Sequence, residues 1–129
     1  ALKSFLSTED GANLLMAHKR ASNIVRIEVK NDGREYPGPA NPDGLTDDAE
    51  RDLARRLSET ARESGEAIAQ QDFGRAMAHL AALRGPIDTF FDRVKVNVED
   101  VALRENRLRL LSQICGTLNQ VADFSQIEG

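Results

Sequence analysis

The sequence predicts an all-α protein, and three observations support this fold class. Ala, Leu, Arg and Glu, which favour helices, are abundant. Aromatic residues, which strands prefer, make up only 5% of the 129 residues. Apolar residues recur at spacings of three and four, the period of an amphipathic helix. We therefore expect an antiparallel bundle of about five helices, folded as a single domain over residues 1–129.

The first expected helix covers about residues 9–29. Ser7 and Thr8 give it an N-cap signal, and acidic residues follow in the first turn. Its apolar positions form one stripe that includes His18, which we therefore expect to be a core histidine rather than a metal ligand. The residues Asn31-Asp32-Gly33 end the helix.

Residues 31–46 form the main irregular segment, because three prolines and three glycines interrupt it. A second helix follows the capping residues Thr46, Asp47 and Asp48, and its apolar residues repeat at helical spacing as far as Ile68.

A third helix carries apolar residues from Phe73 to Leu83, with Asp72 as its N-cap. Pro86 is well tolerated in a first helical turn, so it starts a fourth helix. The last helix is long and covers about residues 100–124.

Charge and cysteine usage limit the classes of protein that this chain can represent. The net charge is −4, and the isoelectric point of about 5.2 argues against a protein that coats nucleic acid by bulk attraction. Cys115 is the only cysteine, which fits a reducing compartment, and we expect a cytoplasmic protein. No apolar run is long enough to span a membrane. Because no initiator Met precedes Ala1, we expect a piece of a longer chain, and removal of the initiator Met is the alternative explanation.

The residues that commonly carry catalysis are few and scattered. His18, His79 and Cys115 show no metal-ligand spacing, and no glycine-rich phosphate loop is present. Asp88 and Asp92 lie four residues apart, but a helix cap and a salt bridge are commoner roles for such a pair than catalysis. We therefore expect neither catalysis nor a bound metal or cofactor in this segment.

The first helix carries a file of polar residues that suits nucleic acid. Lys19, Asn23, Arg26 and Lys30 share one helix face, and Arg20 lies beside it. Cations can contact phosphates while an amide contacts base edges. The spacing alone still favours an ordinary solvated face.

The last helix places two arginines on or beside its apolar stripe. Arg107 projects close to the middle of this stripe, and Arg104 lies beside it. A cation there must pair, reach solvent or face a partner. We expect an ion pair between Arg107 and Asp92 or Asp100, while a phosphate or base contact stays open as the functional alternative.

Several blocks of the sequence match the pattern of a known family. The segments 8–15 (TEDGANLL) and 19–25 (KRASNIV) resemble the T-E-D-G-x-N-L-L and K-R-A-x-N-I-L patterns of the bacterial glycyl-tRNA synthetase β subunit. Residues 86–94 (PIDTFFDRV) resemble its P-V-D-x-F-F-D-x-V. Residues 99–108 (EDVALRENRL) and 121–125 (VADFS) resemble its E-D-x-x-L-R-x-N-R-L and V-A-D-x-S. These matches are in order and span nearly the whole chain.

The resemblance implies the C-terminal anticodon-binding domain of that subunit, of the all-helical type named for an Asp-Ala-Leu-Arg signature. Here the signature is replaced by Val101-Ala102-Leu103-Arg104, with the acid at Asp100. In the family, an α subunit activates glycine with ATP and Mg²⁺, so this segment is expected to bind tRNA rather than catalyse.

The expected partners are the anticodon region of glycine tRNA and, through the longer chain, the α subunit. We expect no binding to a membrane. The candidate tRNA-binding residues are Lys19, Arg20, Asn23, Arg26, Asn97, Arg104, Asn106 and Arg107. The alternative is a helical protein-interaction module that does not bind RNA.

Overall fold

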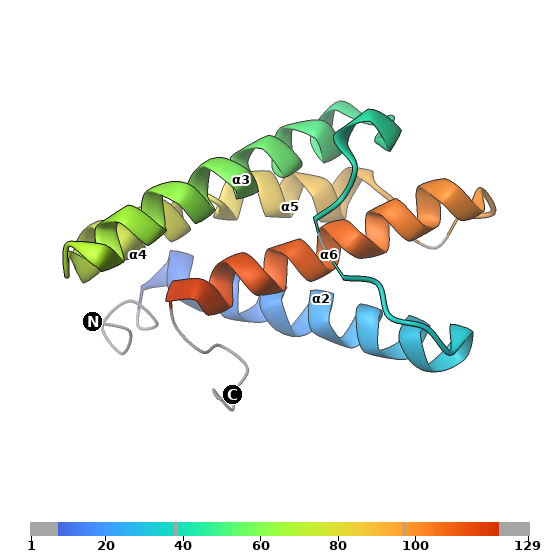
Figure 1. Cartoon of the computed structure of the whole chain (residues 1–129), viewed down its shortest axis with the longest axis horizontal. Helices are drawn as coiled ribbons and strands as arrows, with labels where there is room; N and C mark the ends of the chain where they lie inside the picture. The colour runs from blue at the N-terminus through green and yellow to red at the C-terminus, as the bar shows by residue number, and fades with distance from the viewer. Residues whose placement is uncertain (1–7, 38, 97, 122–129) are drawn as a thin grey trace.

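The computed structural model describes residues 8–37, 39–96 and 98–121, and the all-α prediction is confirmed for them (Figure 1). The helices are α2 (Glu9–Asp32), α3 (Asp48–Ala69), α4 (Phe73–Ala81), α5 (Arg84–Arg93) and α6 (Val101–Val121). A single 3₁₀ turn, η1 (Pro42–Gly44), interrupts the segment between α2 and α3. None of the helices within the described ranges is long and apolar enough to cross a membrane.

Local capping interactions fix both ends of α2. The Thr8 Oγ1 accepts a hydrogen bond of 3.1 Å from the Gly11 N–H, as an N-cap should. At the other end Gly33 adopts a left-handed φ of 66°, and its N–H donates to the Val29 carbonyl at 2.8 Å. The helix therefore continues to Asp32, beyond the expected end at Val29, and stops at the predicted glycine.

A capping box begins α3. The Asp47 carboxylate accepts a hydrogen bond of 2.8 Å from the Ala49 N–H. In return, the Glu50 carboxylate accepts one of 3.0 Å from the Asp47 N–H. The predicted cap is thus correct, and Glu50 completes it.

Helices α4 and α5 are separated only by Ala82 and Leu83, and together they run back along α3 (Figure 1). Asp72 caps α4 as predicted, with its Oδ1 accepting from the Arg75 N–H at 3.1 Å. Helix α5 starts at Arg84, and Pro86 lies in its first turn, where the missing N–H costs little.

Helix α6 lies between α2 and α3 and contacts both (Figure 1). Its buried residues join those of the other helices in one core, whose largest fully buried side chains include Leu14, Leu53, Leu57, Phe90 and Leu111. Helix α5 packs against α2 and α3 on another side of this core.

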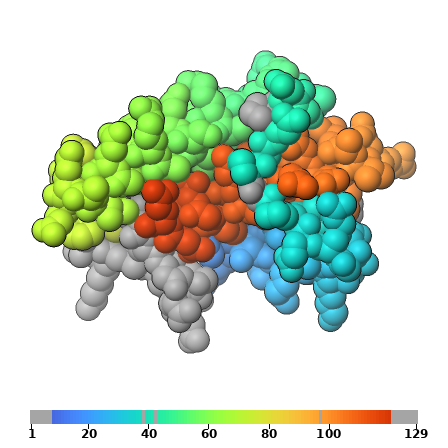
Figure 2. Space-filling view, viewed as in Figure 1, coloured from blue at the N-terminus to red at the C-terminus, as the bar shows by residue number. Residues whose placement is uncertain are grey.

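The irregular segment between α2 and α3 crosses over α6 and is held there (Figures 1 and 2). Tyr36, Ala40 and Leu45 bury their side chains in the core. The Ser112 hydroxyl of α6 donates to the Tyr36 carbonyl at 2.6 Å. The Gln113 side-chain oxygen accepts from the Ala40 N–H at 3.2 Å. The segment is therefore part of the packed structure despite its prolines and glycines.

Candidate nucleic-acid interface

The basic face of α2, which carries the polar residues that the sequence placed on one side of this helix, is open to solvent. Asn23, Arg26 and Lys30 are exposed and Lys19 is partly exposed, while Leu14, Ala17 and Ala21 of the same helix are buried. The Arg26 guanidinium donates to the Asn23 Oδ1 at 3.1 Å, an exposed bond that a ligand can replace. This face can therefore reach a phosphate backbone without unfolding the helix.

Arg20 lies beside this face and is anchored by an aromatic stack. Its guanidinium carbon lies 4.2 Å from the centroid of the Phe91 ring, a cation–π contact. The Phe91 ring in turn meets the buried Phe90 ring edge-on, with 5.5 Å between the centroids. This chain of contacts fixes the position of an exposed cation relative to the core.

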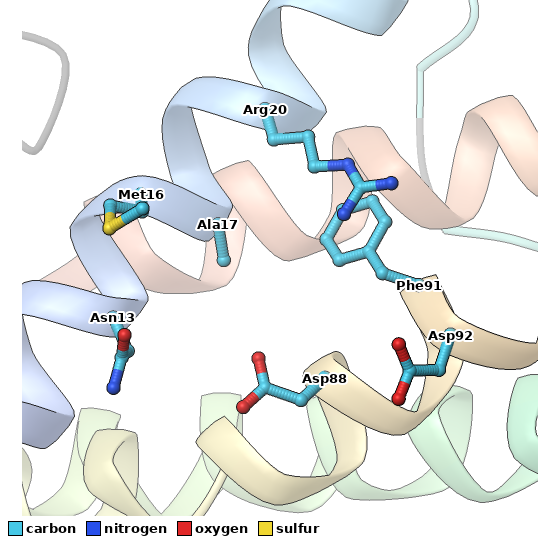
Figure 3. A pocket seen from close by; sticks show the side chains of 7 residues that line it. All are labelled: Asn13, Met16, Ala17, Arg20, Asp88, Phe91 and Asp92. Carbon is cyan, nitrogen blue, oxygen red and sulfur yellow. The ribbon is translucent and has the colours of Figure 1, made fainter.

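A hollow of about 490 Å³ opens between α2 and α5 next to this pair. Its lining residues are Asn13, Met16, Ala17, Arg20, Asp88, Phe91 and Asp92, and Figure 3 shows both carboxylates of α5 turned toward the space between the helices. A second hollow of about 460 Å³ shares Arg20 and Phe91 as its wall and is otherwise lined by Ile24, Glu28, Val94, Lys95 and Val96.

The two aspartates of the first hollow differ in their partners. Asp88 Oδ2 lies 3.7 Å from Arg84 Nε, so it forms the kind of ion pair that the sequence favoured. Asp92 is exposed and makes no hydrogen bond or ion pair with any residue that the structure describes. One carboxylate is thus available to a ligand without breaking an existing contact.

Arg107 forms a buried ion pair, but the predicted partners Asp92 and Asp100 were wrong. Its Nε and Nη2 donate to the two carboxylate oxygens of Glu50 at 2.9 and 2.8 Å, and its Nη1 donates to the Lys95 carbonyl at 2.5 Å. The arginine is only 8% exposed, so its donors are used inside the bundle. The sequence carried a signal for Glu50, which stands in line with the buried Leu53 and Leu57.

Asn106 and Arg104 are also engaged within the fold. The buried Asn106 amide accepts from the Asn41 N–H at 2.6 Å and donates to the Asn41 carbonyl at 2.7 Å. Arg104 pairs with Glu28 and, at 2.8 Å, with Asp32. These residues join α6 to the end of α2 and to the irregular segment.

The same cluster shifts the titration of its charged groups. A hydrogen bond from the Tyr36 hydroxyl at 2.6 Å and another from Arg104 lower the pKa of Asp32 below its ordinary value. The hydrogen bond to Asp32 is the largest of several interactions that raise the pKa of Arg104. Arg104 therefore stays charged and committed to carboxylates.

The structure divides the predicted site residues into two groups. Those of α2, namely Lys19, Arg20, Asn23 and Arg26, lie on an accessible helix surface. Those of α6, namely Arg104, Asn106 and Arg107, form hydrogen bonds or ion pairs with other residues of the bundle and are not on its exposed surface. The remaining candidate, Asn97, lies outside the described residues.

The structure also shows the surroundings of the other reactive groups that the sequence singled out. In the part of the chain that is described, no group of three or more His, Cys, Asp or Glu residues could hold a metal ion. Burial raises the pKa of the Cys115 thiol to about 11, which disfavours the nucleophilic thiolate. His18 is 3% exposed, as expected for a core histidine.

Comparison with known proteins identifies relatives of this chain over its whole length. The chain is 55% identical over its whole length to a glycine–tRNA ligase beta subunit of Rhodospirillum centenum, of which it covers 18%. It is 46% identical over its whole length to a subunit of the same name from Cereibacter sphaeroides, again covering 18%. Over 99% of its length it is 46% identical to that of Phenylobacterium zucineum, covering 19%. The chain thus spans about a fifth of the length of these relatives.

A known protein family matches nearly the whole chain. The family described as the DALR anticodon binding domain matches residues 14–128, which include most of α2 and all of the helices that follow. This match favours anticodon recognition over the alternative of a protein-interaction module without RNA. The all-helical fold, the accessible basic face of α2 and the family match together lead to one assignment: the chain belongs to the DALR anticodon binding domain family.

Proposed function

We propose that this chain binds the anticodon region of glycine tRNA as one part of a longer glycyl-tRNA synthetase β subunit. The observation that carries this proposal is the accessible face of α2, where Lys19, Arg20 and Arg26 surround Asn23. Lys and Arg neutralise phosphates, and an asparagine amide can pair with the edge of an unstacked base. The negative charge of the rest of the chain suppresses binding to unrelated RNA.

The other parts of the proposal concern the longer protein. We infer that it acts in the cytoplasm with an α subunit that charges tRNA with glycine, and that ATP and Mg²⁺ are used there rather than in this domain. On this view, the domain contributes recognition and the α subunit contributes chemistry.

The proposal is tested by measuring tRNA affinity against salt concentration in the complete synthetase. Removing one phosphate contact lowers the slope of log K against log salt by about one unit. We expect this change for Lys19→Ala and for Arg26→Ala, with similar weakening for cognate and anticodon-altered tRNA. Asn23→Ala is expected to weaken only the cognate tRNA, because a base contact carries sequence information.

A matched control is Arg62→Ala, which removes an exposed cation from α3 and should leave affinity and slope unchanged. If Lys19→Ala and Arg26→Ala behave like this control, the α2 face does not bind tRNA. If the wild-type enzyme binds glycine tRNA and its anticodon-altered form equally, anticodon recognition itself is refuted.

A further inference from the structure

The segment at 86–94 carries polar residues that core packing does not explain. Ile87, Phe90 and Val94 are buried and account for the apolar pattern of α5. Asp88 and Asp92 instead turn toward the space between α5 and α2 (Figure 3). Asp88 pairs with Arg84, whereas Asp92 makes no hydrogen bond or ion pair with the described residues, and both line the same hollow as Arg20.

We propose that the hollow between α2 and α5 is a pocket for a single nucleobase that presents an amino group, and that its occupant is a cytosine of the anticodon. This inference rests on the function proposed above and assigns recognition of one base to Asp88 and Asp92 of α5, next to the basic face. A volume of about 490 Å³ lies within the range of small-molecule sites and accommodates one base.

The charges in the hollow select a base rather than a phosphate. The carboxylates of Asp88 and Asp92 repel phosphate oxygens but accept hydrogen bonds from the amino group of cytosine. The amide of Asn13, which lines the same hollow, supplies a donor for an acceptor of the same base. Uracil has a carbonyl oxygen where cytosine has its amino group, so it places an acceptor against the carboxylates.

The walls of the hollow also suit a flat ring. Arg20 is held over Phe91 at 4.2 Å, and arginine planes and aromatic rings are common stacking partners of unpaired RNA bases. Met16, which lines the hollow from α2, is 67% exposed despite its apolar side chain. A base in the hollow would cover apolar surface of Met16 that is otherwise in water.

The genetic code supplies the occupant. Every glycine codon begins with two guanosines, so the anticodon nucleotides that pair with them are cytidines. A reader of this anticodon must reject uridine at these positions, and a carboxylate acceptor does so. Because Asp92 has no partner among the described residues, it can pair with a base without losing another contact.

The test uses the complete synthetase and three glycine tRNA transcripts, namely the wild type and two with one of these cytidines changed to uridine. For the wild-type enzyme we expect about tenfold weaker binding of one uridine transcript, in line with the loss of one good base contact. Asp92→Asn should bring this cytidine-to-uridine ratio close to one, because an amide can present either a donor or an acceptor. Asp88→Asn should lower the ratio at the same nucleotide.

Two controls separate this result from a general effect on charge or folding. Asp43→Asn makes the same change at an exposed residue of η1 and should keep the wild-type ratio. The salt slope should be unchanged in both pocket variants, since no phosphate contact is lost, and unchanged helicity by circular dichroism shows that they fold.

The outcomes also distinguish the two proposals. If the wild-type enzyme discriminates cytidine from uridine and both pocket variants keep its ratio, the base pocket lies elsewhere while anticodon recognition stands. If the wild-type enzyme does not discriminate at either nucleotide, both the pocket and the proposed function are refuted.

Discussion

Replacing Arg107 with alanine is expected to destabilise this domain more than any substitution of an exposed arginine. The Glu50 carboxylate is fully buried and receives two hydrogen bonds from Arg107, of 2.8 and 2.9 Å. Without the arginine, this carboxylate is left in the core with one backbone donor, the Asp47 N–H. Breaking a buried ion pair from one side costs about 3–5 kcal/mol. Small domains have total stabilities of about 5–15 kcal/mol, so this loss is large.

Urea unfolding followed by circular dichroism measures this loss, and a double-mutant cycle assigns it to the pair. Glu50→Gln removes the charge while keeping an oxygen to accept from Asp47, because glutamine also serves in a capping box. We expect the double variant Glu50→Gln/Arg107→Ala to be less destabilised than the sum of the two single variants, since no buried charge is left unpaired.

The matched control is Arg109→Ala, on the same helix. Arg109 pairs with Glu105 at 2.9 Å, but its side chain is 33% exposed. Such a surface pair contributes about 1 kcal/mol or less. The reasoning is refuted if Arg107→Ala lowers the free energy of unfolding by no more than Arg109→Ala does, or if the two single effects simply add.

Three further predictions concern the backbone, acid stability and the thiol. Gly33→Ala should lower the free energy of unfolding in urea by about 1–2 kcal/mol, because φ is 66° at this residue. The control is Gly85→Ala within α5, where the added β-carbon meets no other atom, and it should not lower the free energy of unfolding. Equal losses in the two variants would contradict this prediction. The hydrogen bond from Tyr36 lowers the pKa of Asp32 in the folded protein. The ionised Asp32 therefore stabilises the fold fully at pH values above its ordinary pKa of 3.8, and this stabilisation is lost as the pH falls through the lower pKa of the folded state. Asp32→Asn should flatten this acid limb of the stability curve, and an unchanged limb would exclude the role. Because burial raises the pKa of Cys115 to about 11, alkylation at pH 8 should be far slower in the native protein than in urea; similar rates would show that the thiol is accessible.

The helices were predictable because their signals are local. Thr8, Asp47 and Asp72 cap helices where the sequence places them, and Gly33 ends α2 because its backbone conformation is the one that glycine tolerates. The end of α2 was misplaced because the apolar stripe stops before the helix does. Asp32 lies in the last turn and is held by Tyr36 and Arg104, partners that no local pattern reveals.

The site was predictable only in part. Periodicity placed Lys19, Asn23 and Arg26 on one face of α2, since that depends only on helix geometry. It could not show that Arg20 stacks on Phe91, because the two residues are distant in sequence and meet only when α5 packs against α2. The hollow beside them follows from the same packing.

By itself, the sequence determined the fold class, the caps, the basic face of α2 and the resemblance that the family match confirms, because each depends on residue type and spacing along the chain. Only the tertiary structure decided which charged side chains are available to a ligand. The sequence predicted an ion pair for Arg107 but not its partner, and the structure buries Arg107 against Glu50 while it leaves Arg26 exposed on α2. The physical reason is that pairing of charges depends on distances in space between elements far apart in the chain, and these distances are fixed only when the helices share one core.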